Sequence, residues 1–150
     1  MRRFSLILTL CLVALAVDAQ DFVLKAGTKV AVYMPPMSEP VASTALQMLA
    51  GDMETVLGVE IVPVKKGKKA QVVAVLDDCL PREGFRLYVE KGRLIIRGAD
   101  AHGLAYGLLE VSRLMGVSPW VWWADCLPTL QTTFRLPQGF TSQQRPSVAA

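Results

Sequence analysis

Three tryptophans stand close together near the end of the chain, at Trp120, Trp122 and Trp123, and Asp125 follows them two residues later. Indole rings stack on sugar rings, and a neighbouring carboxylate accepts hydrogen bonds from sugar hydroxyl groups. We therefore predict a sugar-binding surface with Trp120, Trp123 and Asp125 as substrate-binding residues. In an extended segment Trp120 and Trp122 would share one side and Trp123 would take the other. The alternative, that all three pack in the core and Asp125 forms a turn, stays open because large aromatic side chains are often buried.

His102, the only histidine of the chain, is the fourth candidate for substrate binding. It stands between Gly98 and Gly103 at the start of a predicted helix, where glycines and free backbone N–H groups resemble an anion-binding turn. The simpler interpretation is a helix-start residue without a chemical role, because no partner for acid–base or nucleophilic chemistry is identifiable. Tyr106 could reach a ligand over the same helix start, although packing of Tyr106-Gly107 against a sheet is the simpler explanation.

No pair of carboxylates suited to cleaving a glycosidic bond is evident, although such cleavage normally requires two. Asp77 and Asp78 are typical of a turn at the end of a strand, and Asp100 is a helix cap. We therefore predict no catalytic residue in this chain. The cysteines and the single histidine do not form a recognisable metal-ligand pattern, so we expect neither a metal nor a cofactor.

The apolar spacing divides the chain into strands and two helices. The first predicted helix has Ser38 as its N-cap and Pro40 in its first turn. Its apolar positions are Val41, Ala45, Met48, Leu49, Met53, Val56 and Leu57, and Gly58 ends it. Residues 100–116 form the second, which begins at the capping Asp100 and ends at a glycine. Strands are predicted at 29–34, 60–64, 71–76, 85–90 and 93–97, and a weaker one at 131–136. The pair at 85–97 is a hairpin around Lys91-Gly92, since Gly92 can adopt a positive φ.

These elements predict an α/β (α+β) fold, with a mixed sheet of about five strands and two helices packed on one face. Two helices cannot cover both faces, so the other face should meet solvent or another domain. Residues 20–137 are expected to form one domain, and residues 138–150, rich in Gln and Ser, a mobile tail. The run of lysines at 65–69 is interpreted as a solvated loop between strands.

The N-terminus has the anatomy of a secretory signal peptide, covering residues 1–19. Arg2 and Arg3 precede an apolar run at 6–17, and Val17-Asp18-Ala19 provides a cleavage site with small residues. We expect export to the periplasm or outside the cell, with no stable membrane anchor because the apolar run is too short. The net charge of +3 gives no reason to expect a nucleic-acid partner. Export permits a disulfide between Cys79 and Cys126, but spacing alone leaves it undecided.

Several of these residues carry a resemblance to a known family. Gly98-Ala99-Asp100, Gly103, Tyr106-Gly107 and residues 116–125 resemble the end of the N-terminal domain of glycoside hydrolase family 115, the xylan α-glucuronidases. The likeness extends more loosely over residues 22–98, and Arg145-Pro146-Ser147-Val148 resembles the segment that enters the catalytic barrel of that family. Ala101-His102 depart from it, since the family often has a basic pair there. The resemblance implies the type of accessory domain that precedes the barrel in hexosaminidases and α-glucuronidases.

The resemblance also implies a function. The chain would be the non-catalytic N-terminal domain of an exported glycoside hydrolase, supporting a catalytic barrel that follows it and lining the barrel's sugar pocket. Its partners would be that barrel and xylan-derived or other glucuronate-bearing oligosaccharides. The acids that cleave the bond are expected on the barrel, so the chain alone should be inactive. Two alternatives stay open: a stand-alone secreted carbohydrate-binding module, and a fragment without an independent role, which would expose an apolar face and aggregate.

Overall fold

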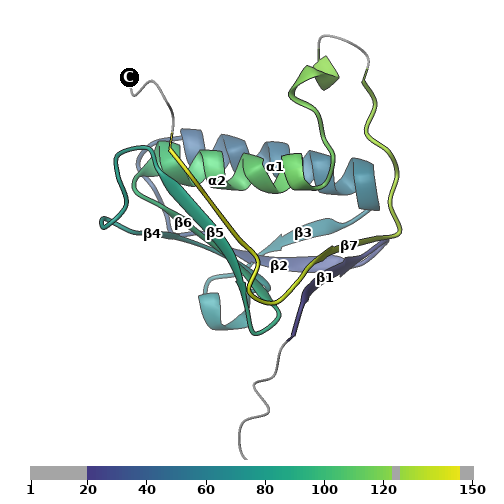
Figure 1. Cartoon of the computed structure of the whole chain (residues 1–150), viewed down its shortest axis with the longest axis horizontal. Helices are drawn as coiled ribbons and strands as arrows, with labels where there is room; N and C mark the ends of the chain where they lie inside the picture. Colours follow the sequence, from purple (N-terminus) through teal and green to yellow (C-terminus); the bar gives the residue numbers. More distant parts are fainter. Residues whose placement is uncertain (1–19, 123–125, 146–150) are drawn as a thin grey trace, which may run out of the picture.

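The computed structural model describes residues 20–122 and 126–145 (Figure 1). Within these residues the chain forms two α-helices, two short 3-10 turns and eight strands. The helices are α1 (Val41–Leu57) and α2 (Ala101–Leu114), and the turns are η1 (Gly67–Lys69) and η2 (Pro119–Trp122). The strands are β1 (Phe22–Lys25), β2 (Lys29–Tyr33), β3 (Glu60–Pro63), β4 (Val72–Leu76), β5 (Phe85–Glu90), β6 (Arg93–Gly98), β7 (Thr133–Leu136) and β8 (Thr141–Gln144).

Six strands form one mixed sheet in the order β3-β2-β4-β6-β5-β8. The first four are parallel, whereas β5 is antiparallel to both β6 and β8. Strands β1 and β7 pair separately as a two-stranded antiparallel sheet, in which Phe22 is opposite Leu136. The predicted α+β class with a mixed sheet is confirmed, and the sheet has one strand more than expected.

The additional strand, β8, lies in the segment that we expected to be a mobile tail. Its sequence Thr-Ser-Gln-Gln has no apolar alternation, so sequence periodicity could not reveal it. Two tertiary interactions hold it: backbone pairing with β5, and a hydrogen bond of 3.1 Å that the Ser142 hydroxyl donates to Glu110 Oε1 on α2. Strand β1 was also missed, because its four residues were too few to recognise as a pattern.

Both helices lie on the same side of the six-stranded sheet, as predicted, and run beside each other (Figure 1). Alternate strand residues point towards them, since successive side chains of a strand face opposite sides. The packing of α2 explains Gly107: a Cβ atom there would lie 2.6 Å from Ile96 Cγ2, so only glycine fits. Central members of the core are Val30, Val72, Ala74, Leu87, Leu94 and Ile96 from the sheet and Leu49, Met53, Leu104, Leu108 and Val111 from the helices.

The helix ends match the sequence prediction in three of four places. Asp100 caps α2 by accepting a hydrogen bond of 2.8 Å from the N–H of Gly103, and Gly116 follows the helix with φ of 86°. Gly58 ends α1 in the left-handed conformation. Ser38, however, is not the N-cap of α1. The cap is Pro40, whose backbone is already helical, and no side chain caps this end.

The loops also follow the prediction. Lys91 and Gly92 both have positive φ, 50° and 71°, as a tight hairpin turn between β5 and β6 requires. The lysines around η1 are exposed between β3 and β4. None of the described helices is long and apolar enough to cross a membrane. The predicted signal peptide, residues 1–19, lies outside the described residues.

Candidate functional site

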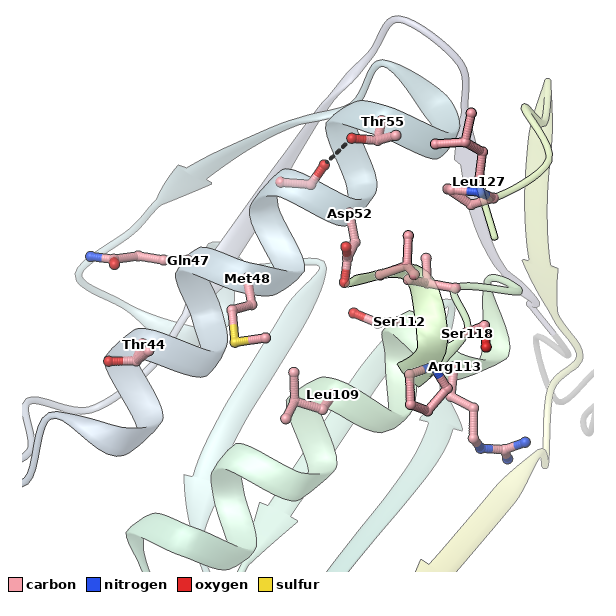
Figure 2. A pocket seen from close by; sticks show the side chains of 15 residues that line it. Thr44, Gln47, Met48, Asp52, Thr55, Leu109, Ser112, Arg113, Ser118 and Leu127 are labelled. Atoms are coloured by element: carbon pink, nitrogen blue, oxygen red, sulfur yellow. Dashed lines mark hydrogen bonds between the residues drawn. The ribbon is translucent and has the colours of Figure 1, made fainter. Parts of the chain in front are cut away.

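A groove of about 760 Å³ lies between α1, α2 and the segment that follows α2 (Figure 2). We call it the helix groove. Most of its lining is apolar, with Met48 from α1, Leu109 from α2 and Val117, Val121 and Leu127 from the following segment. The other lining residues are Thr44, Gln47, Gly51, Asp52, Thr55, Ser112, Arg113, Ser118, Pro119 and Pro128.

Large apolar side chains are exposed around this groove. Met48 is 42% exposed, although its spacing in α1 had suggested a core position, and Leu127 is 85% exposed. Trp120 is 65% exposed and lies in η2 between Pro119 and Val121, which both line the groove. Exposed apolar side chains gathered around one hollow indicate a surface that binds another molecule or domain.

A second hollow, of about 450 Å³, adjoins the helix groove and shares Thr44, Met48 and Leu109 with it. His102 and Tyr106 from α2 line this hollow, together with Glu39, which lies just before α1. Nδ1 of His102 is 3.7 Å from Oε2 of Glu39, and both side chains are at least half exposed. The two hollows form one apolar trough along the helix layer, with polar groups at the His102 end.

The structure places the predicted substrate-binding residues on this helix layer only in part. Trp120 lies beside the helix groove and His102 lines the adjoining hollow, so they lie near opposite ends of the trough rather than at one point. Trp123 and Asp125 lie outside the described residues. The expected extended segment is wrong up to Trp122, because Pro119–Trp122 form the turn η2. Trp120 is not sealed in the core, so the alternative of three buried tryptophans fails for this one.

The glycines around the start of α2 do not form an anion-binding turn. The carboxylate of Asp100 already occupies this helix end, accepting from Gly103 through Oδ1 and from the N–H of Glu83 through Oδ2 at 2.9 Å. A Cβ atom at Gly98 or Gly103 would clash with backbone atoms of neighbouring segments. These glycines therefore serve close packing of α2, and the N–H of Gly103 is already used by Asp100.

Asp77 and Asp78 form the predicted strand-ending turn. Oδ1 of Asp77 accepts from the N–H of Cys79 at 3.1 Å, and Oδ2 is 3.1 Å from Nη1 of Arg97. The hydrogen bond from Arg97 holds the pKa of Asp77 below its ordinary value. Cys79 is an exposed free thiol, so the disulfide with Cys126 that the sequence left open does not form.

Two lining residues of the helix groove went unnoticed in the sequence. Asp52 lies on α1 and Ser112 on α2, and both face the groove (Figure 2). The sequence offered one hint for Ser112: it follows Val111, and Val111 lies on the apolar face of α2 with Leu108 and Met115. Its burial depends on α1 lying alongside, which periodicity within α2 could not reveal.

Comparisons with known proteins agree with this architecture. Residues 14–132 match a family model described as glycosyl hydrolase family 20, domain 2. A solved structure of BtGH115A, described as a family GH115 4-O-methyl-α-glucuronidase with specificity for decorated arabinogalactans, is 38% identical with a TM-score of 0.79. The match covers 85% of this chain and 19% of that one.

Two further solved structures share the fold at low sequence identity. An N-acetyl-β-hexosaminidase of Streptomyces plicatus is 18% identical, with a TM-score of 0.62 and coverage of 87% of this chain and 24% of that one. A GH20 exo-β-N-acetylglucosaminidase of Vibrio harveyi is 9% identical, with a TM-score of 0.58 and coverage of 85% and 17%. No match was found among curated proteins. This chain therefore spans about a fifth of the length of each of these enzymes.

Proposed function

The chain belongs to the glycosyl hydrolase family 20, domain 2 family, a non-catalytic accessory domain of glycoside hydrolases, and we propose that it serves an α-glucuronidase related to BtGH115A. The observation that carries this proposal is the 38% identity over 85% of the chain, against 18% or less for the two hexosaminidase-type structures. The substrates would be oligosaccharides that bear glucuronate or 4-O-methylglucuronate, derived from xylan or from decorated arabinogalactans.

In this proposal the helix groove receives the catalytic part of the enzyme. We expected such a partner on the sheet face opposite the helices, but the helix groove and its apolar lining lie on the helix side. Covering the exposed Met48 and Leu127 would remove apolar surface from water, which stabilises an interface by roughly 25 cal/mol per Å² before the costs of association. The two helices would then lie between the sheet and the catalytic part.

Trp120 and His102 remain proposed substrate-binding residues, together with Trp123 and Asp125. Trp120 supports the idea best, because it is exposed and its two chain neighbours, Pro119 and Val121, line the helix groove. In such an arrangement the tryptophans would line the rim of the sugar pocket, while the acids that cleave the bond belong to the partner. We also propose export through residues 1–19; a mature N-terminus at Gln20 in the secreted protein would support it, and retention of Met1 would contradict it.

A chimeric enzyme tests the docking proposal. Residues 20–145 replace the matching N-terminal stretch of BtGH115A, and release of 4-O-methylglucuronate and thermal unfolding are measured. Met48→Asp places a charge in the proposed interface and should destabilise the chimera by about 2 kcal/mol or more. Leu76→Asp is the matched control, because Leu76 is also exposed, at 51%, but lies outside both hollows.

The isolated chain completes this test. There Met48→Asp should change stability little, because the side chain is already partly in water. The isolated chain should also release no glucuronic acid from aldouronic acids. A chimera that tolerates Met48→Asp as well as Leu76→Asp would argue against docking through the helix groove, and hydrolysis by the isolated chain would overturn the assignment as non-catalytic.

A carbohydrate-binding module is the second candidate function, and the exposed ring of Trp120 favours it. Stacking on a sugar needs one free aromatic face, which this position provides. Calorimetry of the isolated chain with xylo-oligosaccharides should then show saturable heat that Trp120→Ala abolishes. An absence of binding heat in the native chain would dismiss this function and leave the accessory role in place.

A further inference from the structure

The hydroxyl group of Ser112 is an unsatisfied polar group in the wall of the helix groove. Ser112 is only 4% exposed, and its Oγ has no hydrogen-bond partner within the described residues. A helical serine commonly donates to the carbonyl four residues earlier, but this one does not. A buried hydroxyl without a partner destabilises a fold, so a polar group that entered the groove and paired with Ser112 would relieve this cost.

Asp52 presents a carboxylate to the same groove from α1. Figure 2 shows Asp52 and Ser112 on the two helices that border the groove, with both polar groups directed into it. Asp52 is partly buried, and no described residue forms an ion pair or a hydrogen bond with its side chain. A carboxylate in such a position is stabilised most by a cationic hydrogen-bond donor.

No residue in the described parts of the chain supplies that donor. Arg113 also lines the groove, but its guanidinium group is bound to Glu110 by two hydrogen bonds of 2.6 Å, from Nε and Nη2. This pairing holds the guanidinium away from Asp52 (Figure 2). No other lysine or arginine is among the lining residues. Within the described part of the chain, the groove therefore combines an apolar lining with one uncompensated negative charge.

We propose that the helix groove binds a basic side chain, arginine or lysine, of the catalytic part. The cationic head would donate to the Asp52 carboxylate and to the Ser112 hydroxyl, and the aliphatic stem would lie against Met48, Leu109 and Val121. Arginine and lysine have this combination of an apolar stem and a charged head. This inference rests on the proposed docking function, which it deepens by naming the chemistry of the docking group.

The isolated chain and a small probe test this chemistry directly. Butylguanidinium carries the head and stem of an arginine side chain, and 1-butanol carries a stem of equal length without charge. Each is titrated into chain labelled with ¹³C in its methionine methyl groups, and the Met48 signal is followed by NMR. Butylguanidinium should bind saturably in the millimolar range, as expected for so small a ligand, and more tightly than 1-butanol.

Three variants assign the binding energy to the two polar groups. Asp52→Asn should weaken butylguanidinium binding about fivefold or more, because a charge-assisted hydrogen bond is lost. Ser112→Ala should weaken it less, by about twofold to threefold. Glu54→Gln is the matched control, since Glu54 is an exposed carboxylate on the same helix outside the groove, and it should leave binding unchanged.

The inference is overturned if butylguanidinium and 1-butanol bind equally, if Asp52→Asn leaves the affinity unchanged, or if no saturable shift of Met48 occurs. The comparison of the two probes uses the unaltered chain, so it holds even if a variant fails to fold. Failure of the docking function is a separate result. If the chimera tolerates Met48→Asp, docking through the helix groove is refuted. If Met48→Asp destabilises the chimera but the isolated chain does not prefer butylguanidinium, only the proposal of a basic side chain in the groove is refuted.

Discussion

Asp100 offers a sharp test of how the helix layer is held in place. Its carboxylate accepts hydrogen bonds from two backbone N–H groups, that of Gly103 at 2.8 Å and that of Glu83 at 2.9 Å. The first caps α2, and the second ties the helix start to the turn before β5. Glu83 is buried and has a positive φ of 58°, so its N–H depends on this partner.

The expected loss follows from these two bonds. Replacing a capping aspartate by alanine costs about 1 kcal/mol. Leaving the buried N–H of Glu83 without a partner costs about 1–3 kcal/mol more. Asp100→Ala should therefore lower the free energy of unfolding by about 2–4 kcal/mol. Asp100→Asn retains one acceptor oxygen and should lose about half of that, because its amide nitrogen cannot accept from the second N–H.

The same contacts make the effect depend on pH. Burial raises the pKa of Asp100, but the hydrogen bonds from Gly103 and Glu83, with the nearby His102, outweigh it and lower the pKa below 3.8. A carboxyl group with a lowered pKa in the folded state stabilises fully above its unfolded pKa, and that stabilisation is lost as the pH falls through the folded pKa. The difference between the native chain and Asp100→Asn should therefore shrink below about pH 4.

Urea denaturation followed by far-ultraviolet circular dichroism, at neutral pH and at pH values below 4, measures both effects. Asp100→Ala must be less stable than Asp100→Asn at neutral pH. A loss under about 0.5 kcal/mol for the alanine variant would refute the assigned role of the two hydrogen bonds, because it falls within the range of ordinary surface substitutions. A difference that does not change on acidification would refute the pKa argument alone.

Three further predictions follow from individual contacts. Gly107→Ala should destabilise the fold by about 1–3 kcal/mol, because the new methyl group meets Ile96. Gly51→Ala has open space around it and should stabilise α1 by about 1 kcal/mol. Equal effects of the two variants in thermal unfolding would contradict the close packing of Gly107 against Ile96. Ser142→Ala should cost about 1 kcal/mol and speed hydrogen exchange of the β8 amides, and unchanged exchange would show that this bond does not hold the strand. Lys91→Asn should stabilise the hairpin turn by about 0.5 kcal/mol in urea titration, since asparagine tolerates the positive φ of this position; a loss of stability would contradict that turn assignment.

Local chemistry in the sequence determined most of the secondary structure. The hairpin at Lys91-Gly92 and the capping of α2 by Asp100 were predictable, because each depends on residues adjacent in the chain. The glycosidase resemblance was likewise carried by a short continuous stretch of residues and is confirmed by the relatives. The prediction of Ser38 as the N-cap of α1 was wrong. It followed the preference of serine for N-cap positions, but the cap is Pro40, whose backbone is already helical.

Only the tertiary structure decided where surfaces meet. Strand β8 has no apolar pattern of its own and forms because β5 offers an edge and Glu110 holds Ser142. Met48 belongs to an apolar helical pattern, yet it is exposed because α2 covers only part of that helix face. The helix groove, with Asp52 and Ser112 facing it from different helices, exists through packing between residues 60 positions apart, a separation that no local pattern encodes. Sequence thus determined the elements, and the packing of α1 against α2 decided which of their side chains remain available to another molecule.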